Sequence, residues 1–428
     1  MALASLASLF AAVALAMSYS PMTPYDEQAH FDYVARLVTE HRLFPVGEIY
    51  SQTTLDEITC RGIGLEKNGE PRTVCGPQLS KTDLPFEGVN YVAGYSPVFY
   101  VATALVAGPL SSITGISLFL ASRLVCAVWF AAGAGLLTWA LIRLGAKPGV
   151  AAAGSILMAS TPAFLLQGGA VTADSTSLMA GAGSLFIMTL RTTWRRRLGW
   201  ATVFGVLAGL VKSSFIPVAT FVVLMAMVFP IAGGEPRARW RDLSWRRLTG
   251  GLVLASLPVL AQAASNAWRS ASLASGASAD GGMNDILPAA QSVGMEIVLG
   301  GIQLLQPLES VVYINPAGWV AIAVLVQTIL IGGTVVLTLQ PYLPVGGIVR
   351  TTAFAAIGAF VLAVIFLPVT FFVLFHVQAT QGRYALPVMP LFLAAVVLAI
   401  KDVRGGGWLV GAVAAVGWSV ALSAVLAS

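Results

Sequence analysis

Two adjacent carboxylates and an imidazole follow the first hydrophobic segment of the chain. Asp26 and Glu27 precede His30 by four and three residues, so all three side chains share one face of a helix. Apolar residues recur beside that face, which predicts an amphipathic helix that lies on a membrane surface and presents its acids to water. The alternative is an ordinary helix start, because Asp and Glu are favoured in any first helical turn.

The composition defines the class of protein. The chain has 428 residues, 57% of them hydrophobic and 10% charged, and several apolar runs are long enough to span a bilayer. We therefore predict a polytopic, all-α integral membrane protein that forms a single domain over residues 1–428. The net charge of +5 does not indicate nucleic-acid binding, because the positive residues cluster in short loops between apolar runs.

The apolar runs predict about eleven membrane spans. Residues 1–20 resemble a signal peptide, but no Lys or Arg precedes the apolar core, so we interpret them as a retained first span. The predicted spans are residues 2–20, 117–142, 149–167, 175–190, 199–211, 214–230, 249–265, 317–339, 350–373, 384–400 and 406–427.

The charges in the loops predict the orientation of these spans. Arginines cluster within residues 191–197 and 237–247, and both clusters are expected in the cytoplasm. Counting the crossings from these clusters places the N-terminus in the cytoplasm and the acidic region 21–116 outside. The apolar stretch 97–114 must then be a re-entrant or surface-lying helix. Residues 266–316 form a second long outer loop by the same count.

The cysteines fit this orientation. Cys60 and Cys75 lie in the same outer polar region, whereas Cys126 lies in a hydrophobic segment. In an oxidising compartment the first two are expected to form a disulfide. Two free thiols in that region are the alternative.

The topology gathers polar residues at the outer membrane boundary. Charged groups at the edge of the hydrocarbon are costly, and they tend to line a cavity or a ligand path. Milder explanations are a helix cap for Asp174, snorkelling for Lys212 and a span-end anchor for Arg383. The gathered residues are Asp26, Glu27, His30, Asp174, Lys212, His376, Arg383 and Tyr384.

Four short motifs resemble those of the GT-C membrane glycosyltransferases, in the same order along residues 1–400. The first is Asp26-Glu27-Gln28-Ala29-His30-Phe31, and the second is Gly94-Tyr95-Ser96-Pro97-Val98-Phe99-Tyr100, in which Tyr95-Ser96 replaces a His-Pro pair. The third is Val171-Thr172-Ala173-Asp174-Ser175. The last, Gln381-Gly382-Arg383-Tyr384-Ala385-Leu386-Pro387, is similar to a motif of one bacterial branch linked to cell-envelope polysaccharide.

The resemblance implies a reaction and a place for it. A GT-C enzyme takes a sugar from a polyprenyl-phosphate donor, here for an envelope glycan, lipid or protein acceptor at the outer face of the bacterial inner membrane. Asp26 or Glu27 would act as general base, with Asp174 as its partner. Displacement at a sugar carbon also needs cations on the departing phosphate, which Arg383 and Lys212 offer. The other expected substrate-binding residues are His30, His376, Gln381 and Tyr384.

A divalent cation is an open alternative for the acids. If a metal ion is bound, its ligands would be Asp26, Glu27 and Asp174, although carboxylates with at most one imidazole are a weak metal signature. No other cofactor is expected, and the remaining partners are membrane lipids.

Two other classes of function fit the same residues. A transporter or flippase of lipid-linked sugars would use the acids for ion coupling and the cations for phosphate. A polysaccharide polymerase or ligase would also read lipid-linked sugars at the outer face. A purely structural membrane scaffold is the remaining alternative.

Overall fold

The computed structural model of the chain describes residues 1–24, 26–45, 47–63, 75, 84–190, 192–228, 245–272, 292–306, 317–340, 347–375, 381–401 and 403–427. Every regular element in these residues is helical, and the only extended pairings are the isolated bridges Met22–Ile63 and Ile49–Val89. The predicted all-α class is therefore confirmed for the described part of the chain.

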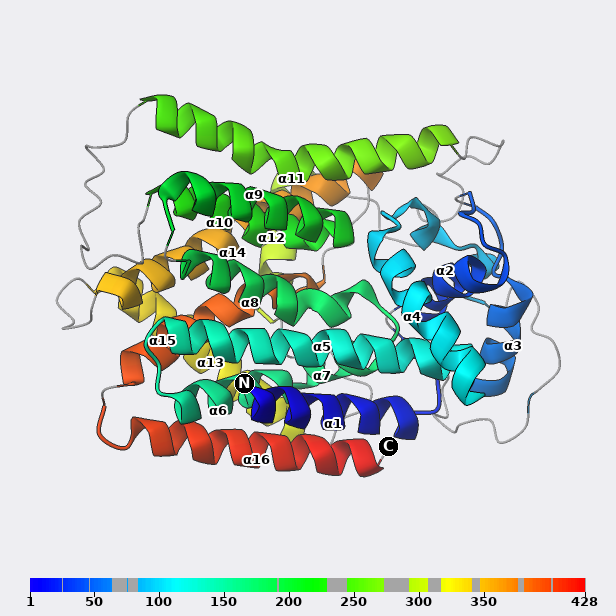
Figure 1. Cartoon of the computed structure of the whole chain (residues 1–428), viewed down its shortest axis with the longest axis horizontal. Helices are drawn as coiled ribbons and strands as arrows, with labels where there is room; N and C mark the ends of the chain where they lie inside the picture. Colours follow the sequence, from blue (N-terminus) through cyan, green and yellow to red (C-terminus); the bar gives the residue numbers. More distant parts are fainter. Residues whose placement is uncertain are drawn as a thin grey trace.

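Most of the helices run side by side in one bundle, with α11 along one edge and α16 along the opposite one (Figure 1). One large apolar core connects all of them except α12, and it includes residues from α1, α5, α8, α10 and α15. The helices of the bundle are α1 (Ala2–Ser18), α5 (Leu118–Arg143), α6 (Pro148–Ala159), α7 (Pro162–Gly169), α8 (Ser177–Met188), α9 (Trp194–Val211), α10 (Ile216–Val228), α11 (Trp245–Ser272), α12 (Val293–Leu304), α13 (Ala317–Leu339), α14 (Gly347–Phe375), α15 (Met389–Ile400) and α16 (Gly406–Ala427).

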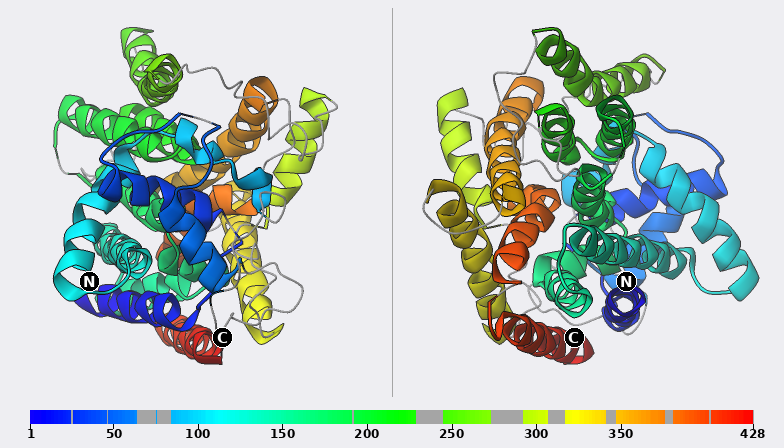
Figure 2. Two further views of the ribbon diagram at one scale, coloured as in Figure 1. Left: turned by 90° about the vertical axis from the view of Figure 1, so that its right-hand side faces the viewer. Right: turned by 60° about the vertical axis from the view of Figure 1, so that its left-hand side comes forward.

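The residues between α1 and α5 form a second, smaller unit, which we call the cap. It covers one end of the bundle, as Figures 1 and 2 show from three directions. The cap has its own apolar core, which continues to Phe119 and Cys126 of α5 and to Val171 and Ala173. Its elements are α2 (Glu27–Thr39), α3 (Gln52–Arg61), η2 (Pro85–Gly88), η3 (Tyr91–Gly94) and α4 (Val98–Thr114), where η denotes a 3₁₀ turn.

Six described helical segments are long and apolar enough to cross a membrane, and there is a seventh if α6 and α7 are counted as one broken span. The bend between those two helices is 75°. The six segments are Leu118–Arg143, Thr249–Arg269, Gly318–Leu339, Gly347–Thr370, Gly382–Ile400 and Gly406–Leu426.

The predicted number of about eleven spans is not confirmed, because several apolar runs do not form one long helix. The run 149–167 breaks before Pro162, where proline cannot continue the hydrogen-bonding pattern of α6. The run 175–190 contains only the 12 residues of α8 after a 3₁₀ turn. Hydrophobicity alone does not distinguish such interrupted segments from continuous spans. The orientation of the helices in a membrane stays a prediction.

The helix α2 differs from the expected amphipathic surface helix. Ten consecutive residues, Glu27 to Arg36, are buried, so no side of this part faces solvent. The reason is a polar network inside the cap: Asp32 accepts hydrogen bonds from Asn90 Nδ2 at 2.8 Å, Arg36 Nε at 3.1 Å and the Ser51 backbone at 2.7 Å. This network fixes α2 against α3 and η3, and with it the position of Asp26 at the helix start.

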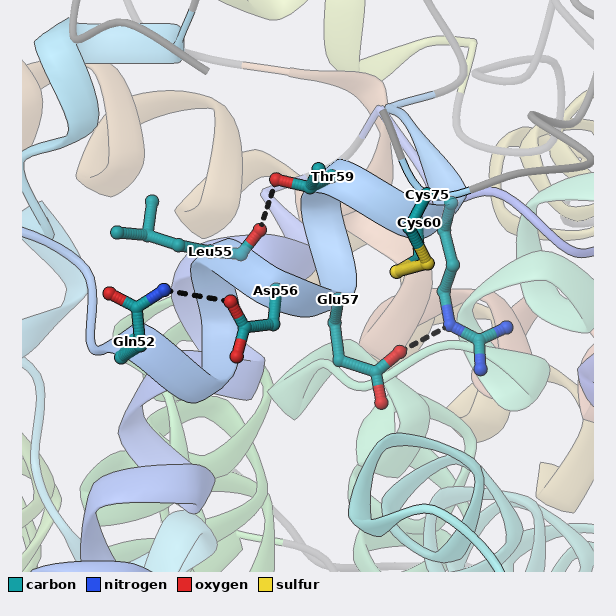
Figure 3. The surroundings of a disulfide bond; sticks show 8 residues. Gln52, Leu55, Asp56, Glu57, Thr59, Cys60 and Cys75 are labelled. Carbon is teal, nitrogen blue, oxygen red and sulfur yellow. Dashed lines mark hydrogen bonds and ion pairs between the residues drawn. A yellow bond between two sulfur atoms is a disulfide. The ribbon is translucent and has the colours of Figure 1, made fainter. Parts of the chain in front are cut away.

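The predicted disulfide between Cys60 and Cys75 is present. Cys60 lies in the last turn of α3, where Gly62 ends the helix with φ +71° (Figure 3). The helix begins with Ser51 as a hydrogen-bonding cap, and Arg61 forms an ion pair with Glu57 at 2.5 Å. The remaining cysteine, Cys126, is free and buried.

Among the described residues, three helices of the bundle begin with a 3₁₀ turn, and these turns meet beneath the cap. They are η4 (Ala173–Thr176) before α8, η5 (Ser213–Phe215) before α10, and η7 (Gly382–Val388) before α15. Contacts join η5 to η7 and η7 to α8. Gly181 of α8 permits the close contact between α8 and η7, because a Cβ at this position would collide with the carbonyl oxygen of Pro387. Polar residues on these turns are thereby brought within reach of the start of α2.

Candidate functional site

Asp26 occupies the position immediately before α2. Its backbone has φ 65°, in the left-handed region that Asp tolerates better than most residues. Its carbonyl oxygen accepts hydrogen bonds from the N–H groups of Ala29 and His30 at 3.0 and 3.1 Å. The side chain makes no capping hydrogen bond to α2, and its Oδ2 lies 2.8 Å from Nη2 of Arg383.

Asp26 is the first member of a continuous chain of ion pairs. Arg383 Nε also lies 3.7 Å from Asp174 Oδ2, and the same oxygen lies 2.6 Å from Lys212 Nζ. The order Asp26–Arg383–Asp174–Lys212 alternates acid and base and balances two negative against two positive charges. The structure thus brings together four of the predicted site residues from segments that lie far apart in the sequence.

Exposure distinguishes the members of this ion-pair chain. The Asp26 side chain is 28% exposed, whereas those of Asp174 and Arg383 are 1% and 3% exposed. The ring of Tyr384 lies beneath both cations, 5.2 Å from Lys212 Nζ and 5.6 Å from the Arg383 guanidinium carbon. Such cation–π contacts stabilise buried cations. Of the four residues in the ion-pair chain, Asp26 is therefore the one that a molecule from solvent reaches most easily.

Two pKa shifts describe the electrostatics at the start of α2. Burial raises the pKa of Asp26, but the charge of Arg383 and a hydrogen bond from Tyr91 outweigh it, so the pKa is lowered overall. Burial also lowers the pKa of His30 to about 3, and the nearby charge of Lys212 adds to the effect. Asp26 is therefore ionised and His30 neutral near neutral pH.

His30 belongs to an aromatic wall beside the ion-pair chain. Its Nδ1 lies 2.7 Å from the hydroxyl oxygen of Tyr100, and its ring stacks on that of Tyr100 at 5.8 Å between centroids. Tyr95 lies on another side, with its ring centroid 6.2 Å away. The neutral imidazole therefore has a structural contact that joins α2 to α4 within the cap, beside the start of α2.

The structure separates Glu27 from Asp26 although the two are adjacent in sequence. The Glu27 carboxylate accepts two hydrogen bonds from Arg123, both at 2.8 Å, and one each from the backbone N–H groups of Thr23 and Val171 at 2.6 and 2.8 Å. Its residue exposure is 0%. Four donors occupy this carboxylate, so it joins the start of α2 to the segment before Asp174 and has little capacity left for a substrate.

We expect Glu27→Gln to destabilise the protein strongly, because it leaves the Arg123 guanidinium buried without its counter-charge. Breaking a buried pair in this way costs about 3–5 kcal/mol. The midpoint of thermal unfolding in detergent measures the effect. Glu57→Gln is the matched control, because its pair with Arg61 is partly exposed and is worth at most about 1 kcal/mol. Equal unfolding temperatures for the two variants would contradict the assignment.

A divalent metal ion does not fit these acids as they are arranged. Within the described residues, no group of three or more His, Cys, Asp and Glu side chains is placed to hold a metal ion. Asp26 and Asp174 are each paired with a cationic side chain, and Glu27 is occupied by Arg123. A metal ion would have to compete with three basic groups for its ligands.

Two further predicted site residues, Gln381 and His376, are not part of the ion-pair chain in the described structure. Gln381 directly precedes η7, and its carbonyl oxygen accepts the N–H of Tyr384 at 3.0 Å, but its side chain is exposed. His376 lies outside the described residues. Two residues at the site, Arg123 and Tyr91, were not predicted from the sequence. A lone arginine inside the apolar run 117–142 was a usable signal, because a charge within a span needs a partner.

The fold and the site define a polytopic, all-helical membrane protein with a buried chain of ion pairs at one end of its helical bundle. This polypeptide belongs to the family described as "Predicted membrane protein (DUF2142)", whose model matches residues 9–392. Among curated proteins, none matches this chain.

Two solved structures of ArnT from Cupriavidus metallidurans are similar to this chain. The structure bound to undecaprenyl phosphate has 15% sequence identity and a TM-score of 0.49, and the apo structure has 13% and 0.47. Each match covers 94% of this chain, but only 61% and 60% of the ArnT chain. The present chain therefore spans about three fifths of the length of the ArnT structures that it matches.

Proposed function

We propose that this protein is a glycosyltransferase of the GT-C type. It transfers a sugar from a polyprenyl-phosphate donor to an envelope glycan, lipid or protein acceptor at the outer face of the bacterial inner membrane. The observation that carries the proposal is the ion-pair chain, in which a partly exposed carboxylate, Asp26, pairs with the buried cation Arg383, and Asp174 links Arg383 to a second buried cation, Lys212. The motif resemblance of the sequence supports the same reaction.

The chemistry of the reaction requires this combination of groups. Asp26 accepts the proton of the acceptor hydroxyl while the acceptor oxygen bonds to the sugar carbon. The bond from that carbon to the phosphate oxygen breaks, and its electron pair stays on the polyprenyl phosphate. The leaving phosphate thereby gains one negative charge, which Arg383 and Lys212 stabilise. Glu27 holds the two acid-bearing segments in place.

An apolar groove supports a lipid as the donor. It lies between α12 and α14 and has a volume of about 490 Å³. The end of α12 abuts Gly382, where a Cβ would lie 2.7 Å from the carbonyl oxygen of Gln306. A small cluster that includes Leu304 and Tyr384 continues from the groove to the site. The groove is lined by Ile297, Val298, Gly301, Ile302, Leu305, Phe360, Val361, Val364 and Ile365.

We expect Val361→Trp to weaken the binding of a long polyprenyl phosphate, because the indole fills the groove that receives the isoprenoid chain. The affinity for undecaprenyl phosphate should fall about fivefold, close to 1 kcal/mol, while that for geranyl phosphate changes little. Val416→Trp on α16 is the control, since Val416 is also exposed but lies outside the groove. Equal losses for both lipids would argue against the groove.

A reconstitution experiment tests the proposed function against its main rival. The purified full chain is placed in liposomes with radiolabelled polyprenyl-phosphate sugars and with envelope extract as a source of acceptors. A glycosyltransferase releases polyprenyl phosphate and labels the acceptor fraction, and the release requires the extract. Movement of an intact lipid-linked sugar between the leaflets without bond cleavage would instead identify a flippase.

A further inference from the structure

The ion-pair chain poses a problem of competition at Arg383. This guanidinium directly follows Gly382, which meets the end of α12 beside the groove, yet in the structure it binds the Asp26 carboxylate at 2.8 Å. A phosphate that approaches Arg383 therefore meets a carboxylate already in place. Both anions use the same planar fork of N–H donors, so they compete for it directly.

Of the two acids at Arg383, Asp26 is the one that can leave. Asp174 lies farther from the guanidinium, at 3.7 Å, and it has Lys212 as a second cation at 2.6 Å. Asp174 is also almost fully buried, so its charge is costly to leave unpaired. The Asp26 side chain is 28% exposed, so water replaces part of what it loses.

Asp26 is a poor base as long as its carboxylate is paired with Arg383. The positive charge of Arg383 is one of the causes that lower the pKa of Asp26. A carboxylate released from that charge holds a proton more strongly. The arrangement in the structure is thus suited to a resting state rather than to proton abstraction.

We propose that the donor phosphate displaces Asp26 from Arg383, and that the released carboxylate then serves as the general base. The inference rests on the proposed function and adds an order of events to it, because the base becomes competent only after the donor phosphate occupies Arg383. The acceptor proton then passes to Asp26 as the sugar carbon moves from the phosphate oxygen to the acceptor oxygen. When polyprenyl phosphate leaves, Asp26 loses its proton to water and pairs with Arg383 again.

Removing the negative charge of Asp26 should increase the affinity for the phosphate, whereas removing a binding residue would decrease it. The variant Asp26→Asn should bind undecaprenyl phosphate about tenfold more tightly than the parent, although it loses the base. Binding is measured on the full chain in nanodiscs with radiolabelled undecaprenyl phosphate as the probe. Asp56→Asn is the matched control, because Asp56 is an exposed acid of the cap whose carboxylate contacts only Gln52 among the described residues.

A double variant tests whether the gain in affinity comes from phosphate replacing Asp26 at Arg383. In an Arg383→Ala background, Asp26→Asn should bring no increase in affinity, because there is no guanidinium to compete for. If Asp26→Asn does not fold, Asp26→Ser removes the same charge and takes its place. An affinity equal to or lower than that of the parent in the variant that folds would overturn the exchange.

The outcome also separates this inference from the proposed function. If Asp26→Asn loses transfer activity without a gain in affinity, the exchange is wrong and the glycosyltransferase proposal stands. If neither the parent nor any variant binds undecaprenyl phosphate, the donor class itself is wrong. The gain in affinity, confined to the background with Arg383, is the result that we expect.

Discussion

Arg383→Ala is expected to abolish sugar transfer and to weaken the binding of undecaprenyl phosphate at least about thirtyfold. The loss corresponds to roughly 2 kcal/mol, in the range of a charge-assisted hydrogen bond to phosphate. It follows because Arg383 is the buried cation beside both Asp26 and the end of the groove. Binding to the purified variant in nanodiscs measures the effect, and release of polyprenyl phosphate measures the turnover.

Two further variants make this result specific. Arg383→Lys keeps the charge but loses the planar fork, so it should recover only part of the affinity. Arg404→Ala removes an exposed arginine between α15 and α16 and should bind the lipid as the parent does. Parent-like binding by Arg383→Ala would show that the guanidinium serves only to neutralise Asp26 and Asp174.

Asp26→Asn is expected to lower the rate of transfer by a factor of about 10²–10⁴, the usual contribution of a general base. Arg383 and Lys212 remain in this variant, so the loss should fall on the turnover number and not on donor affinity. The same measurement on Asp56→Asn provides the control. A rate within twofold of the parent would exclude Asp26 as the base.

The pH dependence gives an independent check on Asp26. Its pKa is lowered in the structure, so the carboxylate stays ionised as the pH falls through the usual range of an Asp. The kcat/KM of the parent, which reports the free enzyme with its Asp26–Arg383 pair closed, should decline only on the acid side, when Asp26 is protonated, and His30 with a pKa of about 3 should add no step near pH 6.5. A rate that declines near pH 6.5 would assign the limiting proton transfer to an imidazole.

The two carboxylates at the start of α2 show where sequence analysis reached its limit. Asp26 and Glu27 were equally suitable as the base by residue type and spacing. In the structure, Asp26 precedes the helix with a left-handed backbone, whereas Glu27 is its first residue. Their carboxylates therefore enter different surroundings, one beside Arg383 and the other beside Arg123. Which acid is accessible depends on partners that are distant in sequence.

Arg383 shows the same dependence on distant partners. Its sequence neighbourhood offers no anion, which suggested that a substrate supplies one. The fold brings Asp26 from 357 residues away to within 2.8 Å, so the guanidinium already has a protein partner. The phosphate assignment now depends on the exchange of one anion for another, which only the three-dimensional contacts suggest.

By itself, the sequence determined the class of the protein and the Cys60–Cys75 bond, and it named Asp26, Asp174, Lys212 and Arg383 among the candidate site residues. Hydrophobicity and charge act locally on each segment, so their pattern can be read along the chain. The tertiary structure alone decided that Arg123 pairs with Glu27 and that the four site residues form one chain of ion pairs. Both features depend on contacts between residues that are distant in the sequence, such as the 96 positions between Glu27 and Arg123 and the 357 between Asp26 and Arg383. The energy of a buried charge depends on those partners, and a linear pattern does not contain them.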